Sequence, residues 1–354
     1  MKLKELLAWR PTIEKRLSSE LTREIALARA ESRHLVPFLE ATQEFNLRGG
    51  KRFRALLVLA GYHVAGGKVL AVPVPAAAAL ETFQSWMLIH DDVMDHGEKR
   101  RGGPTMHVSM AEYHSKHELD RLDSDFGEAM AITLGDLMEA VTTRGLLAVK
   151  VPAERKVALM AEYSQMTRLT AYGQLLDVYL GASPLSRVNE QDVLTIHRLK
   201  TAAYTVSSPL RMGAILAGGS PALQQRLGRI GDDLGVAFQL RDDVLGLGLG
   251  DNVSLDKSTN DLFEGKRTLL VIEAWRRASR KGREVLERVL GNPIASPRQL
   301  DDAIEVIRAT GSLDYSEERI AQLRDRAYKA LGTIPKDRAD LLREIGQMLT
   351  ERAK

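Results

Sequence analysis

The sequence contains no cysteine, which excludes disulfide bridges, thiolate metal sites and cysteine nucleophiles. Aromatic residues make up only 5% of the chain, and no stretch shows the convincing alternation of a β-strand. No apolar run approaches the roughly 18 residues that a membrane span needs. The opening residues, Met1-Lys2-Leu3-Lys4-Glu5, include an acid and lack the apolar core of a signal peptide. We therefore expect a cytoplasmic protein without a membrane span.

The sequence also lacks a strong excess of positive or negative charge. The formal net charge is +3 at pH 7, and the basic residues are interleaved with acids, so nucleic acid is not an expected partner. Hydrophobic residues make up 44% of the chain and charged residues 27%, which is typical of an ordinary globular protein.

Apolar residues recur at helical spacing along almost the whole chain, and no linker-like stretch divides it. We therefore expect a single all-helical domain over residues 1–354. Pro209 lies inside one periodic segment and predicts a kink, and residues 116–128 read as an exposed connection. The predicted helices span residues 12–36, 52–65, 76–95, 128–149, 153–181, 190–217, 221–246, 267–280, 298–309 and 316–331.

A cluster of carboxylates, Asp91-Asp92-Val93-Met94-Asp95, follows an apolar helical run. Asp91 and Asp95 are four residues apart, so both side chains project from one face of a helix, whereas Asp92 points about 100° away. The cluster sits at the C-terminal end of its helix, where the macrodipole disfavours negative charge. A bound cation is therefore favoured over a solvated cluster of charges.

A second pair, Asp242-Asp243, has Lys257 and Lys266 downstream, and the first cluster is followed by Arg100-Arg101. Carboxylates gather Mg²⁺, and Arg and Lys bind phosphate oxygens. The two clusters together indicate a site for a diphosphate.

A set of motifs in order along the chain resembles the trans-isoprenyl diphosphate synthase (polyprenyl synthetase) family, over residues of about 48 to 272. Any one of these motifs is weak evidence, but the ordered set is highly specific. The motifs are Gly49-Gly50-Lys51-Arg52-Phe53-Arg54, Asp91–Asp95, Arg100-Arg101-Gly102 with Pro104-Thr105, Gly135-Asp136, Lys200-Thr201, Phe238-Gln239 with Asp242-Asp243, and Gly265-Lys266-Arg267-Thr268.

The resemblance implies an all-α, single-domain isoprenoid-synthase helical bundle around a deep central cavity, assembled as a homodimer. It implies head-to-tail condensation of isopentenyl diphosphate with an allylic diphosphate (dimethylallyl, geranyl or farnesyl). It also implies two or three Mg²⁺ ions, with Asp91, Asp95 and Asp242 as metal ligands.

The resemblance also assigns the diphosphate-binding side chains. Those expected to hold isopentenyl diphosphate are Lys51, Arg54, Gln84 and Arg101. Those expected around the allylic diphosphate are Arg100, Lys200, Thr201, Gln239, Lys257 and Lys266. Among them, Lys200, Thr201 and Gln239 are also expected to stabilise the allylic cation, with Phe238 as a further candidate.

The sequence departs from the family pattern at two places, one just after Asp242-Asp243 and the other around Lys257. Gly246 stands where the family usually has a third aspartate, which removes one carboxylate from the face of Asp242. Asp251 is a candidate to replace it. The family's Gly-Lys-Pro near residue 257 is here Asp256-Lys257-Ser258, so only the central lysine of that motif is retained.

His90, His96 and His107 lie close to the first cluster in the sequence. As metal ligands they would suit a softer ion, because Mg²⁺ prefers oxygen. We therefore expect them in the core or at the rim of the site. Gly135-Asp136 is expected to be a helix-packing position.

Product length is expected to depend on Trp86 and Met87, which precede Asp91 by five and four residues, or about 6–7.5 Å along a helix. In the family, bulk at these positions shortens the product. One aromatic residue and a flexible methionine favour geranylgeranyl diphosphate (C20), with farnesyl diphosphate (C15) as the alternative. Ordinary core packing of the two residues is the competing interpretation.

Two other functions remain open on the sequence alone. A terpene cyclase shares the fold and an aspartate-rich motif, but it does not need Lys51, Arg54 and Arg101 as a second diphosphate site. A non-catalytic subunit of a heteromeric synthase would be expected to lose the first cluster, which is intact here.

Overall fold

The computed structural model describes residues 1–120, 122–248, 260–292 and 294–351. Over these residues all regular secondary structure is helical apart from one two-stranded hairpin, so the predicted all-α class is confirmed. Two compact units are present. The N-terminal unit comprises Lys4–Met160 and Met212–Gly219, and the C-terminal unit comprises Met1–Leu3, Ala161–Arg211 and Ser220–Lys354. The expectation of a single domain stays a prediction.

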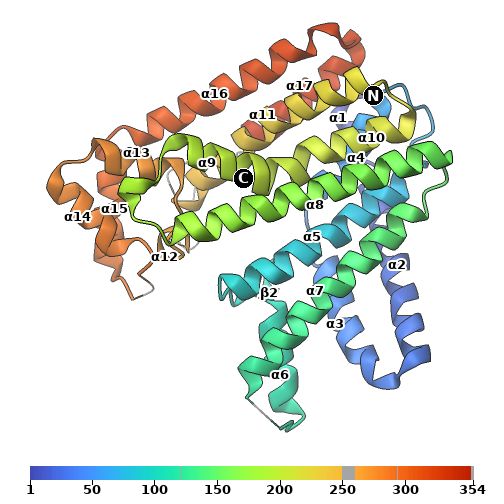
Figure 1. The fold of residues 1–354 in the computed structure, drawn as a ribbon, viewed down its shortest axis with the longest axis horizontal. Helices are drawn as coiled ribbons and strands as arrows, with labels where there is room; N and C mark the ends of the chain where they lie inside the picture. Colours follow the sequence, from blue (N-terminus) through green and yellow to red (C-terminus); the bar gives the residue numbers. More distant parts are fainter. Residues whose placement is uncertain (121, 249–259, 293, 352–354) are drawn as a thin grey trace. The chain divides into compact units, whose positions relative to one another are not determined.

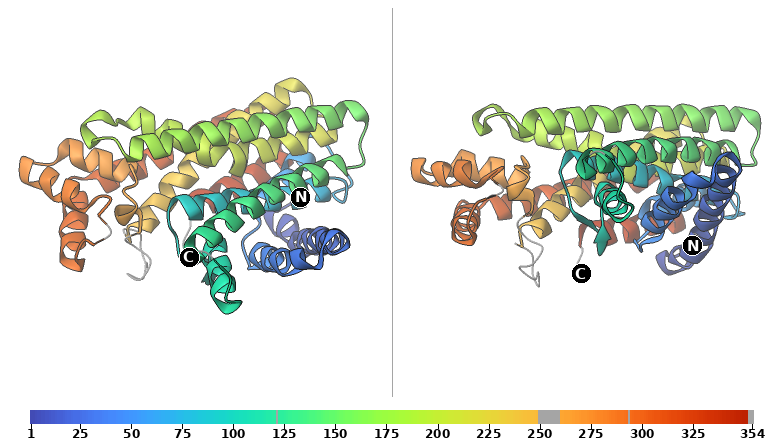
Figure 2. Two further views of the ribbon diagram at one scale, coloured as in Figure 1. Left: turned by 60° about the horizontal axis from the view of Figure 1, so that its bottom comes forward. Right: turned by 90° about the horizontal axis from the view of Figure 1, so that it is seen from below.

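Helices of the N-terminal unit pack around α5, and α2 and α3 lie side by side as an antiparallel pair (Figures 1 and 2). The elements of this unit are α1 (Leu3–Leu7), α2 (Arg10–Glu31), η1 (Arg33–Leu35), α3 (Val36–Leu47), α4 (Phe53–Val64), α5 (Val74–Met94), β1 (Lys99–Arg100), β2 (Gly103–Pro104), α6 (Met106–Lys116) and α7 (Asp123–Leu147).

The core of this unit forms where α5 packs against α7, with α2, α3 and α6 around them. Its members are apolar side chains at helical spacing, which is the pattern that predicted these helices. The buried residues of this core are Leu17, Leu21, Phe45, Ala78, Ile89, Met106, Met110, Ala131, Leu134, Met138 and Val141.

The C-terminal unit is built on α11, which packs against η3 on one side and α16 on another (Figure 1 shows α16 beside α11). Two helices, α8 (Ala153–Gly181) and α10 (Ser208–Ala217), contribute residues to both units. The other elements are η2 (Leu185–Arg187), α9 (Glu190–Ile196), η3 (His197–Ser207), α11 (Pro221–Gly246), α12 (Asn260–Phe263), α13 (Leu269–Arg277), α14 (Arg280–Val289), α15 (Pro297–Ala309), α16 (Ser312–Ala330), η5 (Leu331–Thr333) and α17 (Lys336–Thr350).

Local sequence signals explain where several of these helices begin. Ser220 caps α11 by accepting a hydrogen bond from the Leu223 N–H at 3.3 Å, with Pro221 following in the first turn. Asn189 and Asp192 form a reciprocal capping box at the start of α9.

Most predicted helices are present, but some boundaries were wrong. The predicted helix over 12–36 ends at Glu31, and α3 begins at Val36, with Pro37 in its first turn. The predicted connection over 116–128 is helical from Asp123 onward. The pattern also missed α3, α6, α14 and α17 and the β1–β2 hairpin. In α14 the cause is composition, because Arg, Lys and Glu outnumber its apolar residues.

A π-helix precedes Pro209, and the kink predicted at Pro209 stays a prediction. The predicted helix over 190–217 consists of α9, the π-helical η3 and α10, which begins at Ser208. The Ser208 N–H bonds to the Ala203 carbonyl five residues back, and Pro209 has no N–H to continue an α-helical ladder. Lys200 and Thr201 lie within this wide segment.

No helix in the described part of the chain is long and apolar enough to cross a membrane.

Candidate active site

The first carboxylate cluster lies at the C-terminal end of α5. Asp91 belongs to the last turn, and Asp95 is the C-cap residue, whose N–H donates to the Asp91 carbonyl at 2.8 Å. Both side chains are partly exposed and lie one turn apart on one face. This placement is compatible with the predicted pairing of Asp91 with Asp95, which would offer hard oxygen ligands where the helix dipole is already negative.

Asp92 differs from its neighbours because it is buried, with only 1% of its surface exposed. Arg100 pairs with it, and the Arg100 Nε donates to the Asp92 Oδ1 at 2.9 Å. Desolvation raises the pKa of Asp92, and the hydrogen bond from Arg100 opposes that rise. Asp92 thus fastens the β1–β2 hairpin to α5. The guanidinium expected to bind the allylic diphosphate is engaged here by a carboxylate.

The β1–β2 hairpin carries Arg101 and Gly102 at its tip, with φ of 51° and 79°. Positive φ at both central residues corresponds to a type I′ turn, which favours Asn or Gly. An arginine in the left-handed region costs about 1–2 kcal/mol. Such a strained residue is a candidate for a functional role.

The glycine-rich loop before α4 lies beside this hairpin tip. The Arg101 Nη1 is 3.4 Å from the Gly49 carbonyl oxygen, and Gly49 and Gly50 both have positive φ. Between loop and hairpin lies an open hollow of about 610 Å³, lined by Glu44, Arg48, Gly49, Gly50, Arg101, Gly102 and Gly103. Within the N-terminal unit, two motifs that are separate in the sequence thus meet, as an anion site requires.

The other side chains predicted to bind isopentenyl diphosphate lie on neighbouring elements of the same unit. Lys51 is exposed in the loop, with its Nζ 5.9 Å from the centre of the Phe53 ring. Arg54 is in the first turn of α4 and is partly exposed, and Gln84 is partly buried on α5.

Arg52 is a residue whose importance the sequence reasoning missed. It is buried at the N-cap of α4, with φ of 54°. Its Nη1 lies 3.1 Å from the Glu81 Oε2, and its Nε lies 3.4 Å from the Glu14 Oε1. Arg52 therefore ties the loop to α5 and α2. The sequence did contain one sign of this ion pair. Glu81 is the one acid in the apolar run over residues 76–89, and a buried acid needs a basic partner.

The second cluster lies in the last turns of α11. Asp242 is partly exposed, whereas Asp243 is buried and accepts hydrogen bonds on both oxygens. The Gln239 Nε2 donates to its Oδ1 at 2.8 Å, and the His197 Nε2 is 2.9 Å from its Oδ2. The Thr201 Oγ1 donates to the Gln239 Oε1 at 3.0 Å. This chain of contacts fixes η3 against α11 and brings Thr201, Gln239 and the aspartate pair together, as predicted.

The lysines predicted near the allylic diphosphate have carboxylate neighbours. The Lys200 Nζ is 2.6 Å from the Asp177 Oδ2, and the Lys266 Nζ is 2.5 Å from the Glu264 Oε2. Lys257 and Asp251 lie outside the described residues, so their predicted roles stay predictions.

The donor set fits Mg²⁺ that is completed by a phosphate ligand. Among the described residues, no three His, Asp or Glu side chains gather into a site that the protein alone would complete. Mg²⁺ usually binds one or two carboxylates and fills its remaining positions with water and substrate phosphates. The Asp91–Asp95 pair matches that pattern.

The residues before Asp91 serve the core of the N-terminal unit. Trp86 packs against that core and makes an edge-to-face contact with Phe83, with ring centres 5.6 Å apart. His90 lies against α7, where a Cβ on Gly135 would be 2.4 Å from the His90 Nε2. Gly135 is therefore a helix-packing position, and His90 a packed rim histidine, as expected. Met87 is partly buried.

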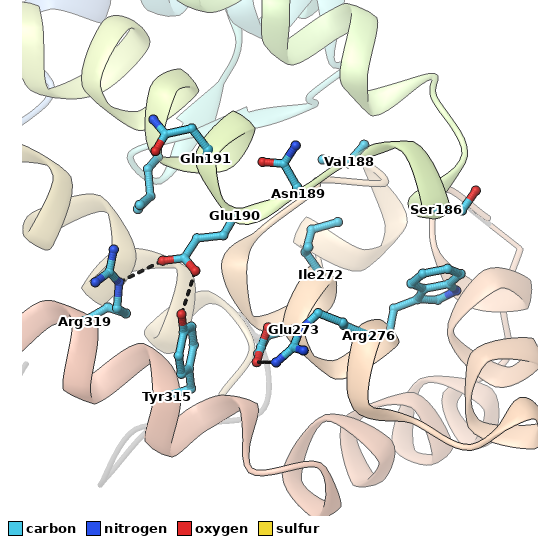
Figure 3. A pocket seen from close by; sticks show the side chains of 12 residues that line it. Ser186, Val188, Asn189, Glu190, Gln191, Ile272, Glu273, Arg276, Tyr315 and Arg319 are labelled. Carbon is cyan, nitrogen blue, oxygen red and sulfur yellow. Dashed lines mark hydrogen bonds and ion pairs between the residues drawn. The ribbon is translucent and has the colours of Figure 1, made fainter.

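Another pocket, in the C-terminal unit, does not meet the requirements of an ion site (Figure 3). Its Glu190 accepts a hydrogen bond from the Tyr315 hydroxyl at 2.6 Å and pairs with Arg319 at 2.8 Å. Its Glu273 pairs with Arg276 at 2.6 Å. The charges that line this pocket are balanced, and none of the sequence-predicted site residues lines it.

Comparison with known proteins extends over nearly the whole chain. A model of the polyprenyl synthetase family matches residues 36–307. A geranylfarnesyl diphosphate synthase of Aeropyrum pernix is 34% identical over 318 residues, which cover 86% of this chain and 91% of that protein. A geranylgeranyl diphosphate synthase of Saccharolobus solfataricus is 30% identical over 321 residues, which cover 89% of this chain and 90% of that protein.

A similar fold occurs in a solved structure. The crystal structure of a Corynebacterium glutamicum geranylgeranyl pyrophosphate synthase, complexed with isoprenyl diphosphate and magnesium, matches with a TM-score of 0.90 and 33% identity. The match covers 98% of this chain and 99% of that one. The predicted resemblance and fold class are thereby confirmed.

The Arg52–Glu81 pair yields a stability prediction. Replacing Glu81 by Gln leaves the Arg52 charge buried without its main partner, which should lower the free energy of unfolding by about 3 kcal/mol. Urea unfolding followed by circular dichroism measures the change.

Glu14→Gln is the matched control, because Glu14 is one-third exposed and its contact with Arg52 is longer. We expect it to cost about 1 kcal/mol or less. Equal losses in the two variants would contradict the anchoring role of Glu81.

Proposed function

Because the chain belongs to the polyprenyl synthetase family, we propose that it condenses isopentenyl diphosphate with allylic diphosphates to give all-trans geranylgeranyl diphosphate. The chain is a trans-prenyltransferase of the short-chain prenyl diphosphate synthase type. The observation that carries the proposed reaction is the presence, in one chain, of carboxylate pairs and a separate basic loop. The reaction involves one diphosphate that leaves and one that is retained. The carboxylate pairs, through bound metal, suit the first, and the basic loop (residues 49–54) suits the second.

Isopentenyl diphosphate keeps its diphosphate throughout the reaction, so that group needs only to be held. We assign this role to Lys51, Arg54, Gln84 and Arg101. The contact between the glycine-rich loop and the hairpin tip supports the assignment of Arg101. Arginine and lysine can clamp a diphosphate without a metal through charge-assisted hydrogen bonds.

The allylic diphosphate must leave, so its growing negative charge has to be stabilised. We assign Arg100, Lys200, Thr201, Gln239, Lys257 and Lys266 to this task, and Asp91, Asp95 and Asp242 to holding two or three Mg²⁺ ions. Bound Mg²⁺ supplies Lewis-acid stabilisation of the departing diphosphate.

Bond making follows bond breaking. The allylic C–O bond breaks with its electron pair going to the diphosphate, and the double bond of isopentenyl diphosphate attacks the allylic cation. Loss of a proton then restores a double bond. Main-chain carbonyls of η3 near Lys200 and Thr201 and the Gln239 side chain are suited to stabilise the cation. No protein base is assigned, and the inorganic diphosphate accepts the proton.

Trp86 and Met87 support a C20 product. Trp86 is on α5, about 7.5 Å before Asp91, and it is only partly buried although it packs against the core. A large ring at this position would limit the length of the tail, and core packing alone is the competing interpretation. Farnesyl diphosphate as the final product is the alternative.

The two rival functions are less well supported. A terpene cyclase uses one diphosphate and would not need the basic loop. A non-catalytic subunit would not need the Asp91–Asp95 pair, which the chain retains.

We also propose a homodimer. Large apolar side chains on one face of α8 are exposed, with Leu175 and Tyr179 each 68% exposed and Tyr172 one turn earlier. An exposed apolar face of this kind marks a protein interface, and a second copy is the occupant that the family resemblance implies. The cytoplasmic location stays a prediction from the sequence.

The direct test is an assay of the purified protein with isopentenyl diphosphate and Mg²⁺ plus dimethylallyl, geranyl or farnesyl diphosphate. Product sizes are measured by chromatography against prenyl alcohol standards. We expect chain extension from each allylic substrate and C20 as the final product. Cyclic hydrocarbons or no turnover would contradict the proposed function.

The metal assignment predicts the effect of removing a carboxylate. Asp91→Ala and Asp95→Ala should each lower kcat by about 100-fold or more, because charge on the departing diphosphate loses its stabilisation. Steady-state kinetics measures this, and circular dichroism checks the fold. Asp125→Ala, which removes an exposed carboxylate in the first turn of α7, is the control and should change nothing. Variants within tenfold of the unmodified enzyme would refute the assignment.

The proposed clamp on isopentenyl diphosphate predicts an effect on binding. Arg54→Ala should raise the KM for isopentenyl diphosphate by about tenfold or more with a small change in kcat, because this diphosphate is held equally before and during reaction. Arg29→Ala, an exposed arginine on α2, is the control. A KM change confined to the allylic substrate would show that the two diphosphate sites were assigned the wrong way round.

Length control predicts a product change without a comparable rate change. Trp86→Ala should shift products beyond C20, because removing the indole lengthens the space for the tail. It should also cost about 2 kcal/mol of stability from lost packing. Chromatography of the products and thermal unfolding measure the two effects. An unchanged product length in Trp86→Ala, Met87→Ala and the double variant would mean that both residues serve packing alone.

A further inference from the structure

Lys200 lies in an unusual segment, the π-helical η3, whose N–H groups bond five residues back. Such wide turns are rare and occur mostly as short bulges at functional sites. An eleven-residue π-helix therefore needs support from the elements around it. In the C-terminal unit, α8 and α11 both contact this segment.

Gly173 on α8 touches the main chain of Lys200. A Cβ added to Gly173 would lie 2.2 Å from the Lys200 N and 2.6 Å from the Lys200 Cα. Glycine inside a helix costs about 1 kcal/mol relative to alanine. Here it lets two backbones approach, so the place of the Lys200 main chain is set by contact with α8.

Asp177 on α8 forms an ion pair with the ammonium group of Lys200. It follows Gly173 by one helical turn, so both lie on one face of α8. Its Oδ2 is 2.6 Å from the Lys200 Nζ, and only about a quarter of each side chain is exposed. One face of α8 thus contacts Lys200 twice, at its backbone and at its ammonium group.

A second support comes from α11, which packs against η3. A Cβ on Gly231 would lie 2.4 Å from the Ser207 Cα, and a Cβ on Gly235 would lie 2.5 Å from the Ala202 Cβ. These glycines are also one turn apart. The π-helical segment is therefore in close contact with glycine-bearing faces of both α8 and α11 and cannot shift toward either.

We infer that Gly173 and Asp177 are positioning residues for the proposed prenyl transfer: Gly173 fixes the Lys200 main chain, and Asp177 aims its ammonium group. The inference rests on the proposed function, in which Lys200 binds the allylic diphosphate and nearby carbonyls stabilise the cation. Asp177 keeps the ammonium group extended in one direction before the allylic diphosphate binds. Neither residue is assigned any contact with substrate.

The test compares three variants on one helix. Gly173→Ala pushes on the Lys200 backbone, and Asp177→Asn removes the charge that aims its side chain. Gly181→Ala is the matched control, because a Cβ on Gly181, the last residue of α8, meets nothing within 4 Å. Each variant is checked by circular dichroism and thermal unfolding. The kinetic constants are then measured separately for farnesyl diphosphate and isopentenyl diphosphate, with Mg²⁺ present.

We expect kcat/KM for farnesyl diphosphate to fall at least tenfold in Gly173→Ala and Asp177→Asn, with the KM for isopentenyl diphosphate within twofold of the unmodified enzyme. Gly181→Ala should match the unmodified enzyme in both constants. A general loss of structure would raise the KM for both substrates. A loss of kcat/KM for farnesyl diphosphate with an unchanged KM for isopentenyl diphosphate therefore separates positioning from stability.

Each other result overturns a specific statement. An inactive unmodified enzyme would refute the proposed function itself. An active enzyme whose Gly173→Ala and Asp177→Asn variants behave like Gly181→Ala, or show equal rises in KM for both substrates, would refute the positioning role. If Gly173→Ala does not fold, Asp177→Asn decides the question by the same two criteria.

Discussion

Negative charge at the C-terminal ends of two helices is the constraint on which the site depends. Asp91 and Asp95 close α5, and Asp242 and Asp243 lie in the last turns of α11. Neither helix has a basic residue in its last turn, so the dipole and the carboxylates add. Such an arrangement is stable only if other groups supply positive charge or hydrogen bonds. Much of the surrounding structure in each unit supplies these.

In each of the two adjacent pairs, Asp91-Asp92 and Asp242-Asp243, one aspartate is buried and the other is partly exposed. Asp92 and Asp243 are both buried. Asp92 binds Arg100 through one oxygen, and Asp243 binds His197 and Gln239 through its two oxygens. Their neighbours on the same helices stay partly exposed. The buried member anchors a second element, a hairpin in one unit and η3 in the other. The exposed member is then left on a surface that the anchored element has fixed, which is the condition for binding a cation with defined geometry.

Helical periodicity predicted which residues share a face but not which distant element packs on that face. It therefore predicted the pairing of Asp91 with Asp95 on α5. It could not find the contact of Arg52 with Glu81 or of Gly173 with Lys200, because such contacts depend on tertiary packing and leave no periodic signal. The same limit hid the π-helix, since over eleven residues the apolar pattern of η3 also fits an α-helix. Composition hid α14, whose few apolar residues give a weak pattern.

Backbone strain and charge repulsion both occur where the loop before α4, which carries Arg52, meets the hairpin tip, which carries Arg101. Arg52 and Arg101 both adopt left-handed conformations, and a Cβ on Gly50 would lie within 3.6 Å of both guanidinium groups. Desolvation lowers the pKa of Arg101, and the charge of Arg52 lowers it further, although Glu81 opposes this. Glu81 offsets the buried charge of Arg52 and so stabilises the loop. In the proposed function, a diphosphate bound beside Arg101 would relieve the remaining repulsion between the two guanidinium groups. Binding energy gained in this way is the same in the ground state and the transition state, so damage to the loop should appear in KM rather than in kcat.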